Sequence, residues 1–222
     1  MQQEVKSVRT QDTIPFHCKL CGQCCRNIEG EVMLEALDAY RLGRYLRART
    51  SMVQTIEDVY SWFASPAALE DYYPIFVLLT SGKEQACTLL EHGRCTVYEA
   101  RPRVCRLYPF SVDTGRRGKD FAYYQCLDRN QAHFDPVYGG RVSVKDWFHQ
   151  NFSKEDRSYF LAEAEALPQL GRLLRKMPPR KQKEFLFKVL YHRYFNFDLD
   201  QPFLEQYRKN QEALLAALRA EQ

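Results

Sequence analysis

The sequence predicts an α-rich α+β fold, in which a small, irregular core of short strands and loops is surrounded by helices. Two observations predict it. Apolar residues recur at helical spacing near the start of the chain and again from Ser143 to its end. Between these stretches lie short aromatic and β-branched segments, separated by glycines and prolines, which are typical of strands and turns.

Two helices are expected in the first third of the chain. The segment from Glu31 to Arg49 is rich in Leu, Ala, Glu and Arg, with apolar residues at roughly helical spacing. A second helix is expected from Val53 to Ala64, because Pro66 stops a helix. Residues 1–13 are polar, and we expect them to form a lead-in to the fold.

Strands are expected in the middle third. The segment from Tyr72 to Thr80 is aromatic and β-branched, which favours a strand. The segments Leu107–Val112 and Phe121–Gln125 flank a turn that contains Gly115 and Gly118. Two such segments around a glycine-containing turn predict a β-hairpin.

Helices are expected again from Ser143 onward. Ser153 and the acidic residues after it predict the start of a helix, and Pro178-Pro179 ends one helix and suits the start of the next. We therefore expect a helical subdomain at residues 143–222, packed on a cysteine-bearing domain at residues 14–142. Apolar stripes at helical spacing are formed by Leu170, Leu173, Leu174 and Met177, then by Phe187, Leu190, Tyr191 and Tyr194, and finally by Leu204, Tyr207, Leu214 and Leu218.

Composition excludes several classes of protein. With 222 residues, 45% apolar and 27% charged, the chain is long enough to bury a core and is unlike disordered, collagen or coiled-coil sequences. The net charge of +4 does not by itself indicate nucleic-acid binding. Residues 1–13 lack the apolar segment of a secretion signal, and the longest aliphatic run, Ile75–Leu79, is far shorter than the ~20 residues of a membrane helix. We expect a soluble cytoplasmic protein.

The unusual feature is the number and placement of the cysteines. Four of the eight lie within eight residues, four lie in a forty-residue window, and none follows. In a reduced compartment, clustered cysteines are metal ligands or redox groups more often than disulfides. A buried apolar side chain is the alternative for Cys87 or Cys126 taken singly. The candidate metal ligands are Cys18, Cys21, Cys24, Cys25, Cys87, Cys95, Cys105 and Cys126.

The spacing favours an iron–sulfur cluster over zinc. Thiolates suit zinc, copper(I) and iron–sulfur clusters. Cys18-x2-Cys21-x2-Cys24 matches the run that ferredoxin-type [4Fe–4S] sites use, whereas zinc ribbons more often pair two separate Cys-x2-Cys turns. Neighbouring cysteines such as Cys24 and Cys25 rarely both bind one small tetrahedral ion. Two sites, a bridged two-metal site, and one cluster with spare thiols all stay open.

Two blocks of sequence resemble a known family. Residues 16–26, Phe-His-Cys-Lys-Leu-Cys-Gly-Gln-Cys-Cys-Arg, are similar to the signature of the CxxCxxCC cysteine-cluster family, the YkgJ-type zinc- or iron-chelating proteins. Cys87 and the block from Gly93 to Phe110 are similar to that family's distal block, so the resemblance covers residues 14–127. Family members commonly have Pro and Gly after the last cysteine, where this chain has Leu127-Asp128.

The resemblance implies that the cysteines bind a metal or an iron–sulfur cluster. The same cysteine pattern occurs in flagellin lysine N-methylases, which look like larger relatives with an iron–sulfur cluster. Methyl transfer is a remote expectation, since this sequence has no glycine-rich cofactor loop. No catalytic residue is predicted, and whether the protein is an enzyme stays open.

Several residues beside the cysteines have two interpretations. The arginines can offset thiolate charge or form ordinary ion pairs, and the aromatic residues are expected to shield the site from water. His17 and His92 adjoin cysteines, but with eight thiols present we expect them to be exposed or to contact the ligands from outside. The arginines are Arg26, Arg101, Arg103 and Arg106, and the shielding residues are Tyr98, Tyr108, Pro109 and Phe110.

The segment from Arg172 to Arg193 holds eight Lys or Arg and one acid, Glu184, with aromatic residues among them. It could bind nucleic acid, but we favour amphipathic helices with solvated basic faces.

The leading hypothesis is a cytoplasmic iron–sulfur protein, with a [4Fe–4S] cluster that serves electron transfer or a redox-linked activity together with a partner protein. The alternatives are a structural zinc module that binds a partner or nucleic acid through its basic helices, and a metal-trafficking protein that uses Cys24 and Cys25.

Overall fold

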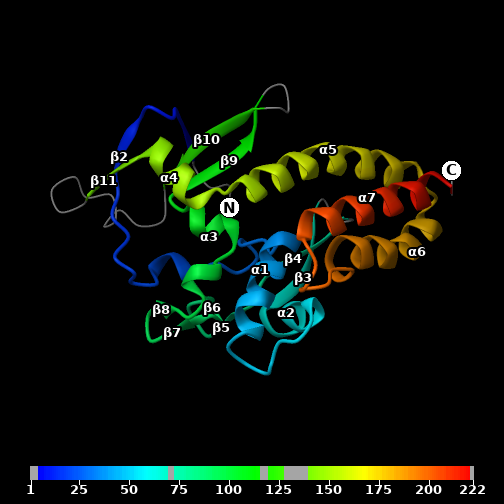
Figure 1. Ribbon diagram of the computed structural model, residues 1–222, viewed down its shortest axis with the longest axis horizontal. Coiled ribbons are helices and arrows are strands. Elements are labelled where there is room, and N and C mark those ends of the chain that lie inside the picture. The colour runs from blue at the N-terminus through cyan, green and yellow to red at the C-terminus, as the bar shows by residue number, and fades with distance from the viewer. Residues whose placement is uncertain (1–4, 70–72, 116–119, 128–139, 221–222) are drawn as a thin grey trace.

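The computed structural model describes residues 5–69, 73–115, 120–127 and 140–220. These residues form a helix-rich α+β fold with several small, separate sheets, as the sequence predicts. Figure 1 shows two parts: a body that contains the sheets and the short helices, and an arm of three long helices, α5, α6 and α7, that extends from it. In the described part of the chain, no helix combines the length and the apolar character that crossing a membrane requires.

The two expected N-terminal helices are present, but the first begins later than predicted. They are α1 (Ala36–Arg47) and α2 (Ile56–Phe63). The residues before α1 lie beside β4 (Tyr73–Leu78): the Leu34 amide donates to the Phe76 carbonyl at 2.8 Å, and Met33 forms a bridge with Val77. These hydrogen bonds hold the backbone extended, so the helix cannot begin at Glu31.

The predicted hairpin is confirmed. β9 (Phe110–Thr114) and β10 (Phe121–Cys126) pair antiparallel, and β1 (Val5–Val8), from within the expected polar lead-in, adds a third strand on the far side of β10. Leu107, expected in the first strand, belongs instead to the short helix α3 (Arg103–Leu107). Four two-stranded pairs complete the sheets: β2 (Thr13–Pro15) with β11 (Arg141–Ser143), β3 (Ala64–Leu69) with β4, β5 (Thr80–Ser81) with β6 (Ala86–Cys87), and β7 (Leu90–Glu91) with β8 (Arg94–Cys95).

The chain is helical from Val144 onward, and Ser153 caps α5 as predicted. The apolar stripe on α6 is not the predicted one. Phe185 and Val189 are buried, whereas Phe187 is 75% exposed and Tyr191 is 52% exposed. After α6 the chain forms the π-helical turn η4 (Tyr191–Phe195). A π turn has more residues than an α turn, so Tyr194, five residues after Val189, is buried on the same side as Val189. The helices are α4 (Val144–Asn151), α5 (Lys154–Lys176), α6 (Pro179–Leu190) and α7 (Phe203–Arg219).

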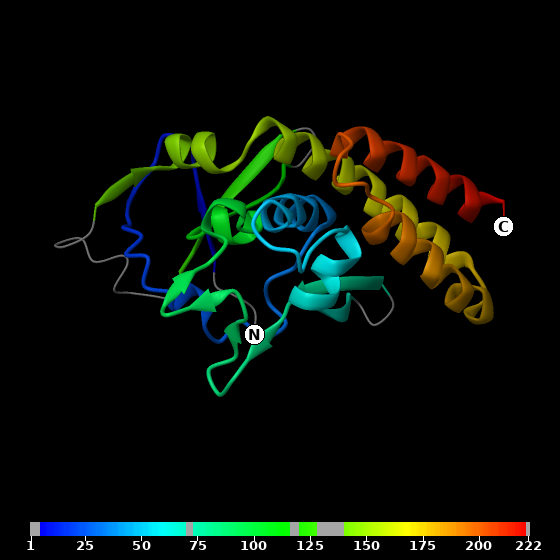
Figure 2. The same ribbon diagram turned by 60° about the horizontal axis from the view of Figure 1, so that its bottom comes forward.

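The cysteine loops lie between two apolar clusters. One cluster joins α1, α2 and β4 to the π turn and the start of α7, and Cys25, Cys95 and Cys105 pack against it. Another joins β9 to α4, and Cys18 packs against that one. Figure 2 shows the short strands of residues 80–95 below α1, and the two apolar clusters are the groups on which the cysteine loops pack.

A buried carboxylate connects three helices of the body and the arm. Asp156, at the start of α5, has no exposed surface. It accepts hydrogen bonds from Arg41 of α1 at 2.6 Å and from Arg106 of α3 at 2.8 Å. Burial alone would raise the pKa of Asp156, but the hydrogen bonds from Arg106 and the charges of both arginines lower it to about 2.

We predict that Asp156→Asn lowers the free energy of unfolding by about 3 kcal/mol at pH 7, because it leaves two largely buried guanidinium groups without their shared counter-charge. The stabilisation by Asp156 is fully present above pH ~4, its unfolded pKa, and is lost as the pH falls through about 2. Urea unfolding of both proteins at pH 7 and near pH 3 measures this, and the difference between them must shrink at the lower pH.

Glu155→Gln is the matched control, because Glu155 also contacts Arg41 but is 38% exposed. Its cost should stay below about 1 kcal/mol. Equal effects of the two substitutions would contradict the role assigned to Asp156.

Candidate metal centre

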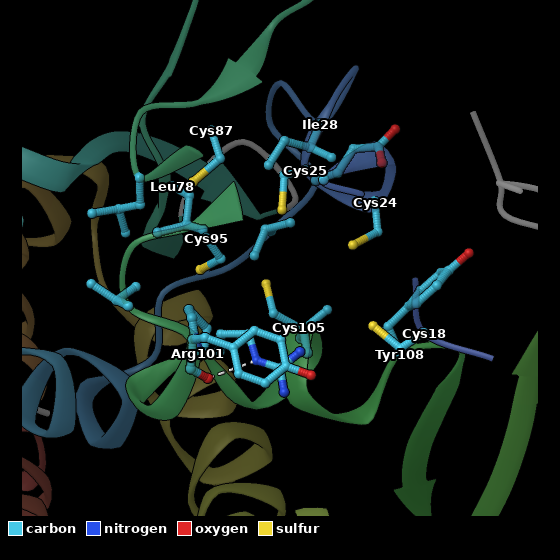
Figure 3. A pocket seen from close by; sticks show the side chains of 18 of the residues that line it. Cys18, Cys24, Cys25, Ile28, Leu78, Cys87, Cys95, Arg101, Cys105 and Tyr108 are labelled. Atoms are coloured by element: carbon cyan, nitrogen blue, oxygen red, sulfur yellow. Dashed lines mark hydrogen bonds between the residues drawn. The ribbon is translucent and has the colours of Figure 1, made fainter. Parts of the chain in front are cut away.

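All eight cysteines line one cavity of about 410 Å³ (Figure 3). All are free thiols. They come from segments that are far apart in the sequence, so the fold brings the two cysteine blocks to one place. Cys18 and Cys21 lie in the loop after β2, Cys24 and Cys25 in the 3₁₀ turn η1 (Gln23–Cys25), Cys87 in β6, Cys95 in β8, Cys105 in α3 and Cys126 in β10.

The first loop is anchored at its start and turned by a glycine. Phe16 is buried, with its ring edge-on to Tyr108 and Trp147 at 5.9 and 5.5 Å. Gly22 has a φ of 69°, and its carbonyl accepts from the Cys25 amide at 3.0 Å. This tight turn places Cys24 and Cys25 at the wall of the cavity, where the Cys25 thiol donates a hydrogen bond to Cys24.

The distal hairpin touches the first loop at Gly22. A Cβ atom on Gly22 would lie 2.7 Å from the Gly93 carbonyl oxygen and 2.6 Å from Leu90 Cδ1. Gly93 itself forms the turn between β7 and β8, with a φ of 75°. Only a residue without a side chain allows this approach, which places Cys95 beside the first cysteine block.

Three ion pairs and a backbone contact fix α3, which carries Cys105. The Arg103 amide donates to Asp38 at 2.8 Å, and its guanidinium donates to Glu35 at 2.7 Å. Arg106 pairs with Asp156 at 2.8 Å and lies 3.8 Å from Asp38. A helix of five residues has little stability of its own, so these contacts with α1 and α5 hold Cys105 in place.

Five of the thiols influence one another electrostatically, and we call them the inner set: Cys24, Cys25, Cys87, Cys95 and Cys105. The pKa of Cys105 is raised by burial and by the neighbouring charges of Cys87 and Cys24. The hydrogen bond from Cys25 and the charge of Arg101 lower the pKa of Cys24 to about 7, whereas the same hydrogen bond raises the pKa of Cys25. Figure 3 shows the sulfurs of Cys25, Cys95 and Cys105 turned toward one space.

The other three thiols form the outer set and have different neighbours. Cys18 is hydrogen-bonded to the Tyr98 hydroxyl, which the sequence suggested only as a shield. Cys126 accepts a hydrogen bond from Ser111, and burial raises its pKa. Cys21 is exposed. Both sets line the same cavity.

The arginines divide between the two predicted roles. Arg101 lines the cavity, stacks on the Tyr98 ring at 3.6 Å and lowers the pKa of Cys24. Arg26 is paired with Glu84, and Arg103 and Arg106 form the ion pairs that hold α3. His17 and His92 are exposed and are not among the residues that line the cavity.

The donors suit a soft metal. Among the described residues, no three His, Cys, Asp or Glu side chains are arranged so that they could hold a metal ion as they stand. The thiols instead lie around the wall of the cavity, with apolar residues such as Ile28, Leu78 and Val97 between them. Thiolates in an apolar surround are the ligand set of zinc and iron–sulfur sites.

Comparison with known proteins identifies the family. Residues 17–132, more than half of the chain, match the family model CxxCxxCC, described as a "putative zinc- or iron-chelating domain". The chain belongs to the CxxCxxCC family. Metal binding is the property that this description gives the domain. No curated protein and no solved structure matches the chain.

Some residues that build the CxxCxxCC site were not singled out from the sequence. Gly22 and Gly93 lie within the two cysteine blocks but have no role in the sequence-based prediction of the site, and neither do Glu35, Asp38 and Asp156. The glycine inside each cysteine block is the sequence feature that could have indicated the close approach of the two loops. No local signal marks the acids, because their partners are 50 to 68 residues away in the sequence.

We predict that Gly22→Ala separates the two cysteine blocks and lowers the amount of metal bound per chain by severalfold. The added Cβ would collide with the Gly93 carbonyl, which is backbone and cannot move aside without shifting the hairpin. Metal analysis of the purified variant, beside its melting temperature, measures the effect.

Gly30→Ala is the matched control, since Gly30 has a φ of 71° and no atom within 4 Å of its Cβ position. Both variants pay the same ~1–2 kcal/mol for a left-handed conformation, but only Gly22→Ala should lose metal. Equal metal contents in the two variants would contradict the role assigned to the contact between Gly22 and Gly93.

Proposed function

We propose that the cavity binds an iron–sulfur cluster of the [4Fe–4S] type, and that the protein uses it in electron transfer or a redox-linked step. The observation that carries the proposal is the placement of the inner-set thiols around the wall of a cavity of about 410 Å³. Family membership supports zinc or iron equally, so the size of the cavity is what favours a cluster.

A zinc ion and an iron–sulfur cluster hold their cysteine ligands at different distances from one another. A zinc ion draws its four sulfurs to ~2.3 Å from a single point, which leaves no space among them. A cluster has several metal and sulfide atoms, and its cysteine ligands lie at its outer corners. Thiols that surround a space, as here, need less movement to bind a cluster than to bind one ion.

The surrounding residues suit a buried redox group. Ile28, Leu78 and Val97 line the cavity beside the inner set, in which Cys87 is buried and Cys24 is exposed, and Arg101 places a positive charge beside Cys24 and Cys95. A cluster bound there would supply a one-electron redox couple, and exclusion of water and nearby charge both tune its potential. All eight cysteines are candidate ligands, with the inner set as the first choice.

The test is purification under argon, followed by measurement of iron, acid-labile sulfide and zinc beside a visible spectrum. We expect a brown protein with about equal amounts of iron and sulfide. A colourless protein with stoichiometric zinc and no iron or sulfide would contradict the proposal and favour a structural zinc module.

Substitution of single cysteines tests the inner set. We predict that Cys105→Ser abolishes most of the visible absorbance of the cluster, because Cys105 lies among the inner thiols on a helix held by ion pairs. Cys126→Ser is the matched control, since Cys126 is hydrogen-bonded to Ser111 and belongs to the outer set. Loss of absorbance in the control alone would place the centre among the outer thiols instead.

A further inference from the structure

We propose that the outer face of α6 and the π turn binds single-stranded nucleic acid. The surface consists of Phe187, Tyr191, Arg180 and Lys188, which we call the arm patch. It lies on the helical arm (Figure 1), away from the cysteine loops. The proposal is independent of which metal the protein binds.

The first observation is the exposure of two aromatic rings on one helix face. Phe187 is 75% exposed and Tyr191 is 52% exposed, although the sequence pattern predicted both to be buried. They are four residues apart and therefore project from the same face. Two neighbouring rings on one helix face form a small exposed apolar patch.

The second observation is the fixed position of the Tyr191 ring. Its hydroxyl donates to Asn196 Oδ1 at 3.0 Å, and its ring lies edge-on to the His192 ring at a centroid distance of 5.2 Å. A ring that is already held in place loses little conformational freedom when a flat group stacks on it. Stacking on aromatic rings is how many proteins hold unpaired bases.

The third observation is the charge around the rings. Arg180 is exposed and, seven residues before Phe187, lies on the face of the two rings, as does the exposed acid Glu184. Lys188 is exposed at the edge of that face, with its ammonium 4.4 Å from the centroid of the buried Phe185 ring. The end of α5 adds the exposed cations Arg172, Arg175 and Lys176. The segment 172–193 holds eight basic residues and one acid. Since the whole chain has a net charge of +4, the residues outside this segment are net negative.

Spacing completes the argument for a single strand. Four residues of a helix rise by about 6 Å, which is close to twice the ~3.4 Å separation of stacked bases along one strand. Two rings at this spacing, with exposed cations on the same helix, offer both the stacking surfaces and the phosphate contacts of a single-strand site. The Tyr191 ring, held through its hydroxyl by Asn196, offers a flat surface on which a base can stack.

The experiment measures binding of a fluorescein-labelled 12-nucleotide oligouridylate to the full-length, metal-loaded protein by fluorescence anisotropy. We expect binding that weakens steeply between 50 and 200 mM salt, roughly tenfold or more. Phe187→Ala and Tyr191→Ala should each weaken it by at least about fivefold, since each ring contributes one stacking contact.

Two matched controls separate stacking and charge from general effects. Trp62→Ala removes another exposed aromatic ring, 54% exposed, from α2, whose first turn carries Glu57 and Asp58, and it should leave binding unchanged. Lys188→Gln should reduce the salt dependence, whereas Lys145→Gln on α4 should not. Circular dichroism checks that each variant is folded.

Three outcomes would overturn the proposal. The first is no binding of the oligonucleotide at 50 mM salt. The second is binding that Phe187→Ala and Tyr191→Ala leave unchanged while a duplex of equal length binds as tightly, which indicates general attraction of polyanions. The third is tighter binding of an oligoglutamate peptide or of phosphatidylserine vesicles than of the oligonucleotide, which assigns the arm patch to an acidic protein or a membrane.

Discussion

Thiols that share one low-dielectric cavity cannot all ionise unless positive charge is placed among them. Burial and the charges of neighbouring cysteines raise the pKa of Cys87 and Cys105, and Arg94 and Arg101 are the cations that line the same space. Two guanidinium groups cannot balance five thiolates. A bound metal group would supply the positive charge that the thiolates need and that the protein alone does not provide.

The convergence of the two cysteine blocks depends on contacts outside the cysteines. The glycine contact between Gly22 and Gly93 sets how closely the loops approach, and the ion pairs of Arg103 and Arg106 hold α3 beneath them. Because Arg106 binds Asp156 at the start of α5, the helical arm and the cysteine loops share one buried charge network. The C-terminal region, which the family match leaves largely uncovered, therefore supports the position of Cys105.

Local patterns predicted what depends on local sequence. The hairpin and the Ser153 cap follow from turn residues and capping chemistry, and each needs only a few neighbouring residues. The late start of α1 and the exposure of Phe187 depend on partners elsewhere: β4 holds residues 32–34 extended, and a π turn shifts the α6 face. Spacing also could not divide the thiols into inner and outer sets, since that division depends on which thiols the fold brings close to one another.

The most direct test of the central claim is X-ray absorption at the iron and zinc edges of the protein purified under argon. We expect iron with a shell of sulfur neighbours and a second shell of iron neighbours, as only a cluster gives. A zinc edge with sulfur at ~2.3 Å and no metal neighbour would show that the cavity closes around a single ion, and would contradict the account given for the inner set.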